Sequence, residues 1–198
     1  MDNRRRKIIN SSTASDNILK YINEQVFIKI FEPHDVNGKE QLEDFFEQTK
    51  ENNNVTSEFG CTWILLEKKE DIYKAITLGQ SQNIRNELLG IYRDMQSISL
   101  SSDKTKRKYY RALYEKDTNL CFYIVDIDLY MNIYWNNYKD DSQNNLFYEI
   151  SKDYFAEATL AYFTGAIDWN YSFGGMDKRF YFHLLDILEE KQKDFKEQ

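Results

Sequence analysis

The densest group of residues that could bind a ligand is a basic and aromatic cluster in the middle of the chain. Five cations with two tyrosines among them make up the cluster: Lys104, Lys106, Arg107, Lys108, Arg111, Tyr109 and Tyr110. Cations of this kind can hold phosphates while an aromatic ring stacks on a base, so the composition suits nucleic-acid binding. The alternative is the solvated face of a helix. Both interpretations place the cluster on one helix over residues 104–116.

Other reactive side chains lack partners at a useful spacing. Cys61 and Cys121 each stand inside an apolar run, which predicts two buried thiols rather than a disulfide or a nucleophile. His34 and His183 have no His, Cys or acidic neighbour at ligand spacing, so we expect both to be structural. The sequence contains no evident phosphate-binding glycine loop and no Ser-His-Asp arrangement.

The charge of the chain argues against a protein that coats nucleic acid with cations. Its 198 residues include 26 Lys and Arg against 33 Asp and Glu, a formal net charge of −7. Nucleic-acid binding by such a chain would require a local positive patch. No apolar run approaches the roughly 20 residues of a membrane-spanning helix, and the basic residues 4–7 are not followed by the apolar stretch of a signal peptide. We therefore expect a cytoplasmic protein without a membrane partner.

Short β-rich runs predict a small sheet. The runs are bounded by polar or turn-forming residues and cover residues 26–31, 62–66, 73–78 and 120–127. A polar turn separates the second run from the third, which predicts an antiparallel hairpin. The continuous apolar run at 120–127 predicts a buried strand of the same sheet.

Segments with the apolar spacing of helices precede and follow these strands in the sequence. Asp16 is the expected cap of a short first helix, and Ser81 the expected cap of a helix with Ile84, Leu88 and Met95 on one face. Further helices are expected at 40–50, 104–116, 147–163 and 177–195, whereas 129–138 is ambiguous. The predicted fold class is α/β (α+β), with a mostly antiparallel central sheet flanked by helices. Residues 16–198 would form one domain, and 1–15 a flexible arm.

One segment resembles a known family. The stretch that ends the third run and opens the next helix reads Ala-Ile-Thr-Leu-Gly-Gln-Ser-Gln-Asn-Ile-Arg-Asn-Glu-Leu, residues 75–88. It resembles the second strand and first helix of the GIY-YIG nucleases, where Tyr-Ile-Gly precedes a Gln-Ser-x-Asn-Ile-Arg-like stretch. Residues 60–65 lie where the family has its Gly-Ile-Tyr strand, and 156–163 resemble its late helix. The resemblance covers roughly residues 60–175, and the order hairpin, two helices, buried strand, helix is similar.

The resemblance implies a DNA endonuclease of restriction or mobile-element type that uses one divalent cation, Mg²⁺ or Mn²⁺. Glu157 matches the metal-binding Glu, and Asn170 matches an Asn in the following loop. Arg85 lies near the helix Arg position, where the family residue itself is replaced by Glu87. Thr77-Leu78-Gly79 replaces Tyr-Ile-Gly and Trp63 falls near the other tyrosine, so Tyr73 becomes the candidate substitute. As a metal ligand in a nuclease, Glu157 should be partly open to solvent.

Each of these residues also has a structural interpretation. Glu157 could be a surface residue, although its apolar neighbours favour a cleft, and Asn170 could be a turn residue. Arg85 could be a surface cation and Tyr73 a core residue. The sequence leaves both interpretations open.

The second functional hypothesis is a non-catalytic interaction module, of immunity or inhibitor type, that kept the fold. It would bind a basic protein through an acidic helix and would need no cofactor. The acids concerned are Glu40, Glu43, Asp44 and Glu47. Net charge and the missing tyrosines favour this hypothesis, while Glu157 with Asn170 favours the nuclease. The sequence does not indicate an oligomeric state under either hypothesis.

Overall fold

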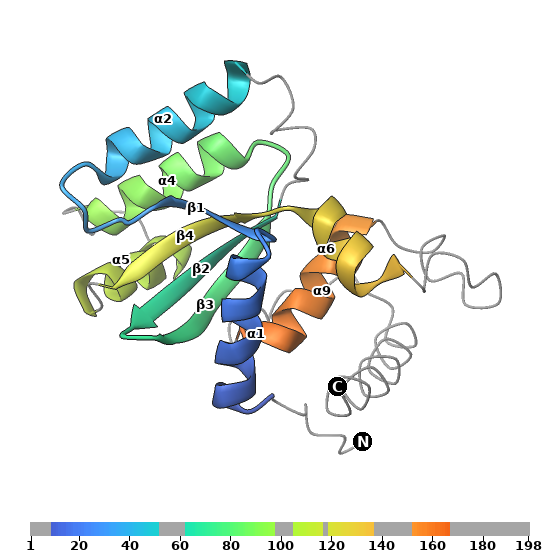
Figure 1. Ribbon diagram of the computed structural model, residues 1–198. Helices are drawn as coiled ribbons and strands as arrows, with labels where there is room; N and C mark the ends of the chain where they lie inside the picture. Colours follow the sequence, from blue (N-terminus) through green and yellow to red (C-terminus); the bar gives the residue numbers. More distant parts are fainter. Residues whose placement is uncertain (1–8, 52–61, 98–104, 117–118, 137–151, 167–198) are drawn as a thin grey trace.

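The fold is a four-stranded sheet with helices on both of its faces (Figure 1). The computed structural model describes residues 9–51, 62–97, 105–116, 119–136 and 152–166. The arrangement confirms the predicted fold class, an α+β domain with a small antiparallel sheet.

All neighbouring strands of the sheet are antiparallel. The strands are β1 (Phe27–Phe31), β2 (Thr62–Lys69), β3 (Ile72–Gln80) and β4 (Leu120–Val125), in the spatial order β1-β4-β2-β3. The predicted hairpin is β2–β3, and the predicted buried strand is β4 between β1 and β2, so both expectations are confirmed. Every residue of β4 is buried, because helices cover both faces of this inner strand. Its sequence is therefore continuously apolar rather than alternating.

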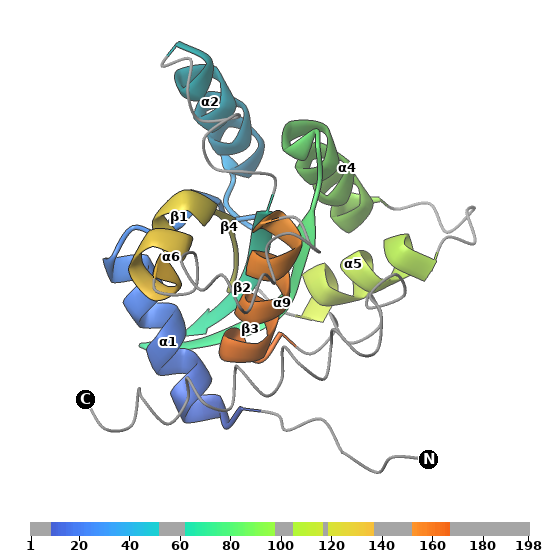
Figure 2. The same cartoon turned by 90° about the vertical axis from the view of Figure 1, so that its right-hand side faces the viewer.

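Among the described residues, three helices lie on each face of the sheet. The α9 face carries α1 (Ser11–Asn23), α6 (Ile127–Tyr134) and α9 (Lys152–Thr164), and the α4 face carries α2 (Gly38–Glu51), α4 (Ile84–Gln96) and α5 (Thr105–Lys116). Figure 2 shows α9 in front of β2 and β3, with α4 and α5 on the opposite side. Among the described residues, none of the helices is long and apolar enough to cross a bilayer.

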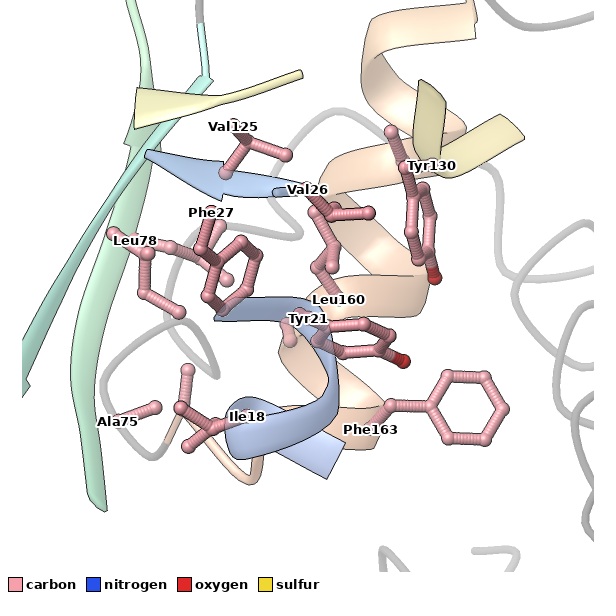
Figure 3. Close-up of a cluster of buried hydrophobic side chains, with 14 of the residues drawn as sticks. Ile18, Tyr21, Val26, Phe27, Ala75, Leu78, Val125, Tyr130, Leu160 and Phe163 are labelled. Carbon is pink, nitrogen blue, oxygen red and sulfur yellow. The ribbon is translucent and has the colours of Figure 1, made fainter. Parts of the chain in front are cut away.

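The core of the α9 face joins α1, α9 and the sheet (Figure 3). Ile18 of α1 and Val26 are fully buried, and so is Leu160 of α9. Burying a side chain of this size stabilises the fold by about 1.5–3 kcal/mol. Tyr21 of α1 adds edge contacts to Tyr130 and Tyr134 of α6, with ring centroids 5.7 and 5.1 Å away. The ring contacts hold α1 against α6.

The core of the α4 face is built around aromatic rings. Phe31 of β1 stacks on Phe122 of β4, with ring centroids 4.8 Å apart, and Trp63 of β2 lies 5.8 Å from the same ring. Leu42 and Phe46 of α2 are buried against this layer. Helix α2 therefore meets the sheet through these two side chains.

The first helix begins earlier than predicted. Asn10, not Asp16, is its cap: the Asn10 side-chain oxygen accepts the Thr13 N–H at 2.8 Å. Residues 11–15, predicted to belong to a flexible arm, form the start of α1, and Ala14 is buried. Asn10 is also a residue type that caps helices, and burial of Ile9 and Ala14 holds this earlier start of the helix against the core.

The ambiguous segment 129–138 begins as a helix. Asp126 caps α6 through the Leu129 N–H at 2.8 Å, so β4 ends at Val125 rather than at 127. The predicted helix at 147–163 corresponds to α9, which begins at Lys152. The expected closing helix at 177–195 lies outside the described residues.

Candidate functional site

Glu157 lies on α9 with only 8 % of its surface exposed. The described side chains around it, from Phe155 to Ala161, are also buried. Helix α9 packs against β3, α1 and α6, which explains why burial extends around the helix instead of following one stripe. The partial exposure expected of a nuclease ligand is therefore not found. A carboxylate in such surroundings needs compensation by hydrogen bonds, an opposite charge or a cation.

Tyr73 occupies the start of β3 and is a core residue. It is 9 % exposed, its backbone N–H donates to Ser15 Oγ at 3.0 Å, and Lys68 Nζ lies 5.4 Å from the centre of its ring. Gln80 ends the same strand, about 24 Å away at the usual rise of a β-strand. Tyr73 is therefore far from Arg85, and the two candidate catalytic residues do not meet.

Arg85 lies in the first turn of α4, on the α4 face. Asn83 caps this helix by accepting the Asn86 N–H at 3.2 Å. A cation is unfavourable at a helix N-terminus, and Glu47 of α2 offsets the charge: its carboxylate lies 3.3 Å from Arg85 Nη2. One acid of the predicted acidic helix thus contacts one candidate catalytic cation.

The basic cluster lies on α5, as both interpretations predicted. Lys108 is exposed, and Arg111 forms an ion pair with Glu115 one turn later at 2.7 Å. Tyr110 is buried in the α4-face core, where desolvation holds the pKa of its hydroxyl above the usual value. A ring in this position cannot stack on a base. Lys104 and Asn170 lie outside the described residues, as do the side chains of Lys106 and Arg107.

Sequence reasoning missed a group of polar atoms where β2 begins and β3 ends. Thr62 pairs with Gln80 across the hairpin, and Trp63 pairs with Gly79. In this region Thr62 Oγ1, Trp63 Nε1, Gln80 Nε2 and Arg85 Nε are buried and have no hydrogen-bond partner. They are divided between the two faces of the sheet: Trp63 belongs to the core of the α4 face, whereas Thr62, the residue before it, lies on the α9 face by the alternation of the strand. The Gln-Ser-x-Asn-Ile-Arg-like stretch marked two of them in the sequence, but nothing local marked Thr62 or Trp63 as polar contributors.

Gly79 makes room for the Trp63 ring. An ideal Cβ at position 79 would lie 2.7 Å from Trp63 Cζ2 and 3.2 Å from Trp63 Nε1. The backbone of β3 therefore lies directly against the edge of the indole that carries its N–H. The glycine that contributes to the family resemblance has a packing role in this chain.

A second polar feature lies near the turn of the β2–β3 hairpin. A cavity of about 230 Å³ is lined by Glu67, Lys69, Ile72 and Lys74. Glu67 is buried and forms ion pairs with Lys69 and Lys74. Its carboxylate is thus already compensated by two cations.

The remaining described histidine and cysteine have structural roles, and His183 lies outside the described residues. His34 stacks on Tyr114 with ring centroids 3.9 Å apart, and its Nε2 lies 2.8 Å from the Tyr114 carbonyl oxygen. Cys121 is buried, which confirms one of the two predicted buried thiols; Cys61 is not among the described residues. Within the described ranges, no three His, Cys, Asp or Glu side chains come together to hold a metal ion.

Fold and site together define the chain as an α+β domain in which an antiparallel hairpin carries buried, unpaired donors at its open end. A scan of protein-family models finds no match, and searches of curated proteins and of solved structures return no significant match. The functional argument therefore rests on the residues and their geometry.

Proposed function

We propose that this chain is a diverged GIY-YIG-like domain that hydrolyses phosphodiester bonds in DNA with the help of a divalent cation. The observation that carries the proposal is the succession of a hairpin, two helices, a buried strand and a late helix, which is similar to the order of elements in the family. Glu157, which matches the family's metal-binding Glu, lies on the late helix α9, and this helix packs against β3 of the hairpin.

The order of elements supports the relationship. The hairpin β2–β3 is followed by α4, α5, the buried strand β4 and then further helices. This is the succession on which the family resemblance rests. Fold similarity leaves the activity to be argued from the site itself.

The proposed cation is Mg²⁺ or Mn²⁺, with Glu157 as its protein ligand. A single carboxylate fits these ions, since Mg²⁺ commonly retains water and binds phosphate oxygens beside one or two carboxylates. When bound, such a cation polarises the scissile phosphate. Tyr73 is given no catalytic role because it is a core residue, whereas Arg85 remains a cation that could bind phosphate.

A plasmid-nicking assay with Mg²⁺ or Mn²⁺ tests the proposal. The wild-type chain should nick plasmid, and Glu157→Gln should abolish nicking while circular dichroism shows that the chain stays folded. Glu67→Gln is the matched control. That carboxylate is also buried and pairs with Lys69 and Lys74. It lies on the hairpin and not on the helix that resembles the family's metal-binding helix, so nicking should persist. A wild type that fails to nick, or an active Glu157→Gln variant, would refute the proposal.

The alternative function, an acidic protein-interaction module, is favoured by the way α2 is placed. Leu42 and Phe46 are buried, while Glu40, Asp44 and Glu47 are exposed. Glu47 also pairs with Arg85, which places an acid beside a candidate phosphate-binding cation. Under this alternative, a lysine-rich peptide should bind in calorimetry and lose affinity to the double variant Glu40→Gln, Asp44→Asn. Duplex DNA would then show no binding even at low salt.

A further inference from the structure

We propose that the cavity near the turn of the β2–β3 hairpin binds a small organic anion, a carboxylate that carries a short branched alkyl group. Its described lining consists of Glu67 and Lys69 of β2 and Ile72 and Lys74 of β3. The site goes beyond the proposed nuclease and does not depend on it, because none of these four residues has a role in that reaction.

The four described lining residues form one patch on one face of the sheet. Glu67 pairs with Lys74 across the hairpin, and Lys69 pairs with Ile72. Residues two apart on a strand share a face, so each strand contributes two neighbouring side chains to the patch. Tyr73, between Ile72 and Lys74, belongs to the core of the α9 face. The patch therefore lies on the α4 face.

The charges of the lining favour an anion. Two lysines line the cavity against one glutamate, and the buried Glu67 side chain forms ion pairs with both. Lys74 Nζ lies 3.8 Å from Glu67 Oε2, which is longer than a hydrogen bond. An ammonium group has three N–H donors, so Lys74 is able to donate to the oxygens of a ligand while it remains near Glu67.

Ile72 indicates that the ligand has an apolar part. Its side chain is 65 % exposed, although it lies directly opposite Lys69 in the sheet. An alkyl group placed against Ile72 removes apolar surface of both molecules from water. Each fully buried CH₂ strengthens binding by about fourfold, equivalent to about 0.8 kcal/mol. A carboxylate with an alkyl chain thus matches both the charge and the apolar surface of the cavity.

The size and surroundings of the cavity restrict the ligand further. A volume of about 230 Å³ corresponds to seven or eight water molecules at about 30 Å³ each, which suits a carboxylate of about five carbons. The turn beside the cavity carries two exposed acids, Glu70 and Asp71. Like charges repel, so these acids disfavour an extended polyanion such as a nucleic-acid strand. A compact anion with a single charge fits better.

A purely structural role for the ion pairs makes a different prediction. Lysines that only compensate the buried Glu67 charge would respond to an organic anion no more than to chloride. In a binding site, by contrast, Glu67 opposes the ligand. Removing its charge leaves Lys69 and Lys74 without an opposing carboxylate in the lining, and anion binding becomes stronger.

The first experiment follows the isoleucine δ-methyl signals of the full chain by ¹³C NMR. Ile72→Leu identifies the Ile72 signal, and Ile133, an exposed isoleucine of α6, is the internal reference. The probes are sodium isovalerate, sodium acetate, sodium phosphate and the neutral 3-methylbutan-1-ol, with sodium chloride used to keep the ionic strength constant.

We expect a saturable shift of the Ile72 signal with isovalerate and no shift at Ile133. Acetate, which lacks the alkyl group, should bind at least about fourfold more weakly, and the neutral alcohol should give no saturable shift. The absence of a saturable Ile72 shift with isovalerate, or equal shifts of both signals, would overturn the proposal. Phosphate or the alcohol binding as tightly as isovalerate would contradict the assigned ligand class.

The second experiment compares isovalerate binding by variants whose thermal melting shows that they are folded. Lys74→Met should weaken binding by about tenfold, equivalent to about 1.4 kcal/mol, because it removes the charged donor and keeps an aliphatic chain. Glu67→Gln should tighten binding. Lys39→Met is the matched control and should leave binding unchanged, since Lys39 is also an exposed lysine paired with an acid, Glu43, but lies on α2.

Ile72→Thr should remove most of the preference for isovalerate over acetate, because it shortens the apolar side chain. Unchanged binding in Lys74→Met, or weaker binding in Glu67→Gln, would show that the ion pairs are only structural. The nuclease is tested separately: Glu157→Gln should lose nicking and keep the Ile72 shift, whereas Lys74→Met should keep nicking.

Discussion

Trp63 and Gly79 show how a single pair of residues shapes the end of the sheet. They face each other across the hairpin, and the ring of Trp63 occupies the space that a side chain at position 79 would need. The indole is 1 % exposed and lies beside Phe122. It therefore cannot move aside without disturbing the core of the α4 face.

We predict that Gly79→Ala destabilises the protein. The new Cβ would lie 2.7 Å from Trp63 Cζ2, and overpacking of this kind typically costs about 1–3 kcal/mol. The measurement is urea denaturation followed by circular dichroism.

Gly90→Ala is the matched control for this substitution. Gly90 lies inside α4, and no atom outside its chain neighbours and the backbone of its own helix comes within 4 Å of its ideal Cβ. Alanine is preferred over glycine inside a helix by about 0.8–1 kcal/mol, so Gly90→Ala should stabilise the protein. Equal effects of the two substitutions would contradict the packing role of Gly79.

Among the elements, α5 is the helix on which the two functional hypotheses differ most clearly. It was predicted to hold phosphates with its cations and to stack a base on its tyrosines. Tyr110 is instead buried in the core, and Arg111 is paired with Glu115. Lys108 is exposed, and it provides the direct test of a DNA contact on this helix.

We predict that Lys108→Gln weakens duplex binding to different sequences by a similar factor. One lost phosphate contact should flatten the slope of log affinity against log salt by about 0.9. Fluorescence anisotropy over a series of salt concentrations measures this slope, and Lys39→Gln on α2 is the control, since Lys39 is an exposed cation that faces Glu43. An unchanged slope would remove α5 from the DNA-binding surface.

At the scale of the whole molecule, burial of ionisable groups in the core links stability to alkaline pH. Burial raises the pKa of the Cys121 thiol from 9.0 to about 12 and that of the Tyr130 hydroxyl from 10.0 to about 12. Both groups stay neutral in the folded chain at a pH where the unfolded chain has already lost the protons. The folded state therefore binds more protons over this range, and the free energy of unfolding falls as pH rises.

We predict full stability up to about pH 9 and then a decline of about 1.4 kcal/mol per pH unit for each group that titrates only in the unfolded chain. The decline begins with Cys121 and steepens above pH 10, the usual pKa of a tyrosine. Urea denaturation between pH 8 and pH 11 measures it. In the Cys121→Ala variant, the decline in the free energy of unfolding should begin about one pH unit higher. Stability that stays constant or rises over this range would contradict the prediction.

Local pattern was sufficient to predict most elements of the fold. The hairpin β2–β3, the buried strand β4 and the amphipathic helices α2 and α4 follow from the spacing of apolar residues, which is a property of each segment alone. The start of α1 was predicted at Asp16, whereas the helix is capped by Asn10. The earlier start depends on burial of Ile9 and Ala14 in the assembled core, which the local pattern does not show.

The sequence by itself determined an acidic α+β chain, a hairpin followed by a capped helix, and a carboxylate among apolar residues of a late helix. Tertiary structure decided which of these features belong together. It separated Tyr73 from Arg85 by the length of β3, paired Arg85 with Glu47, and buried Glu157 between α9 and its neighbours. It also left Thr62 and Trp63 with unpaired polar atoms. The physical reason is that hydrogen-bond pairing and burial depend on segments distant in the sequence, which meet only when the sheet and its two helical layers assemble.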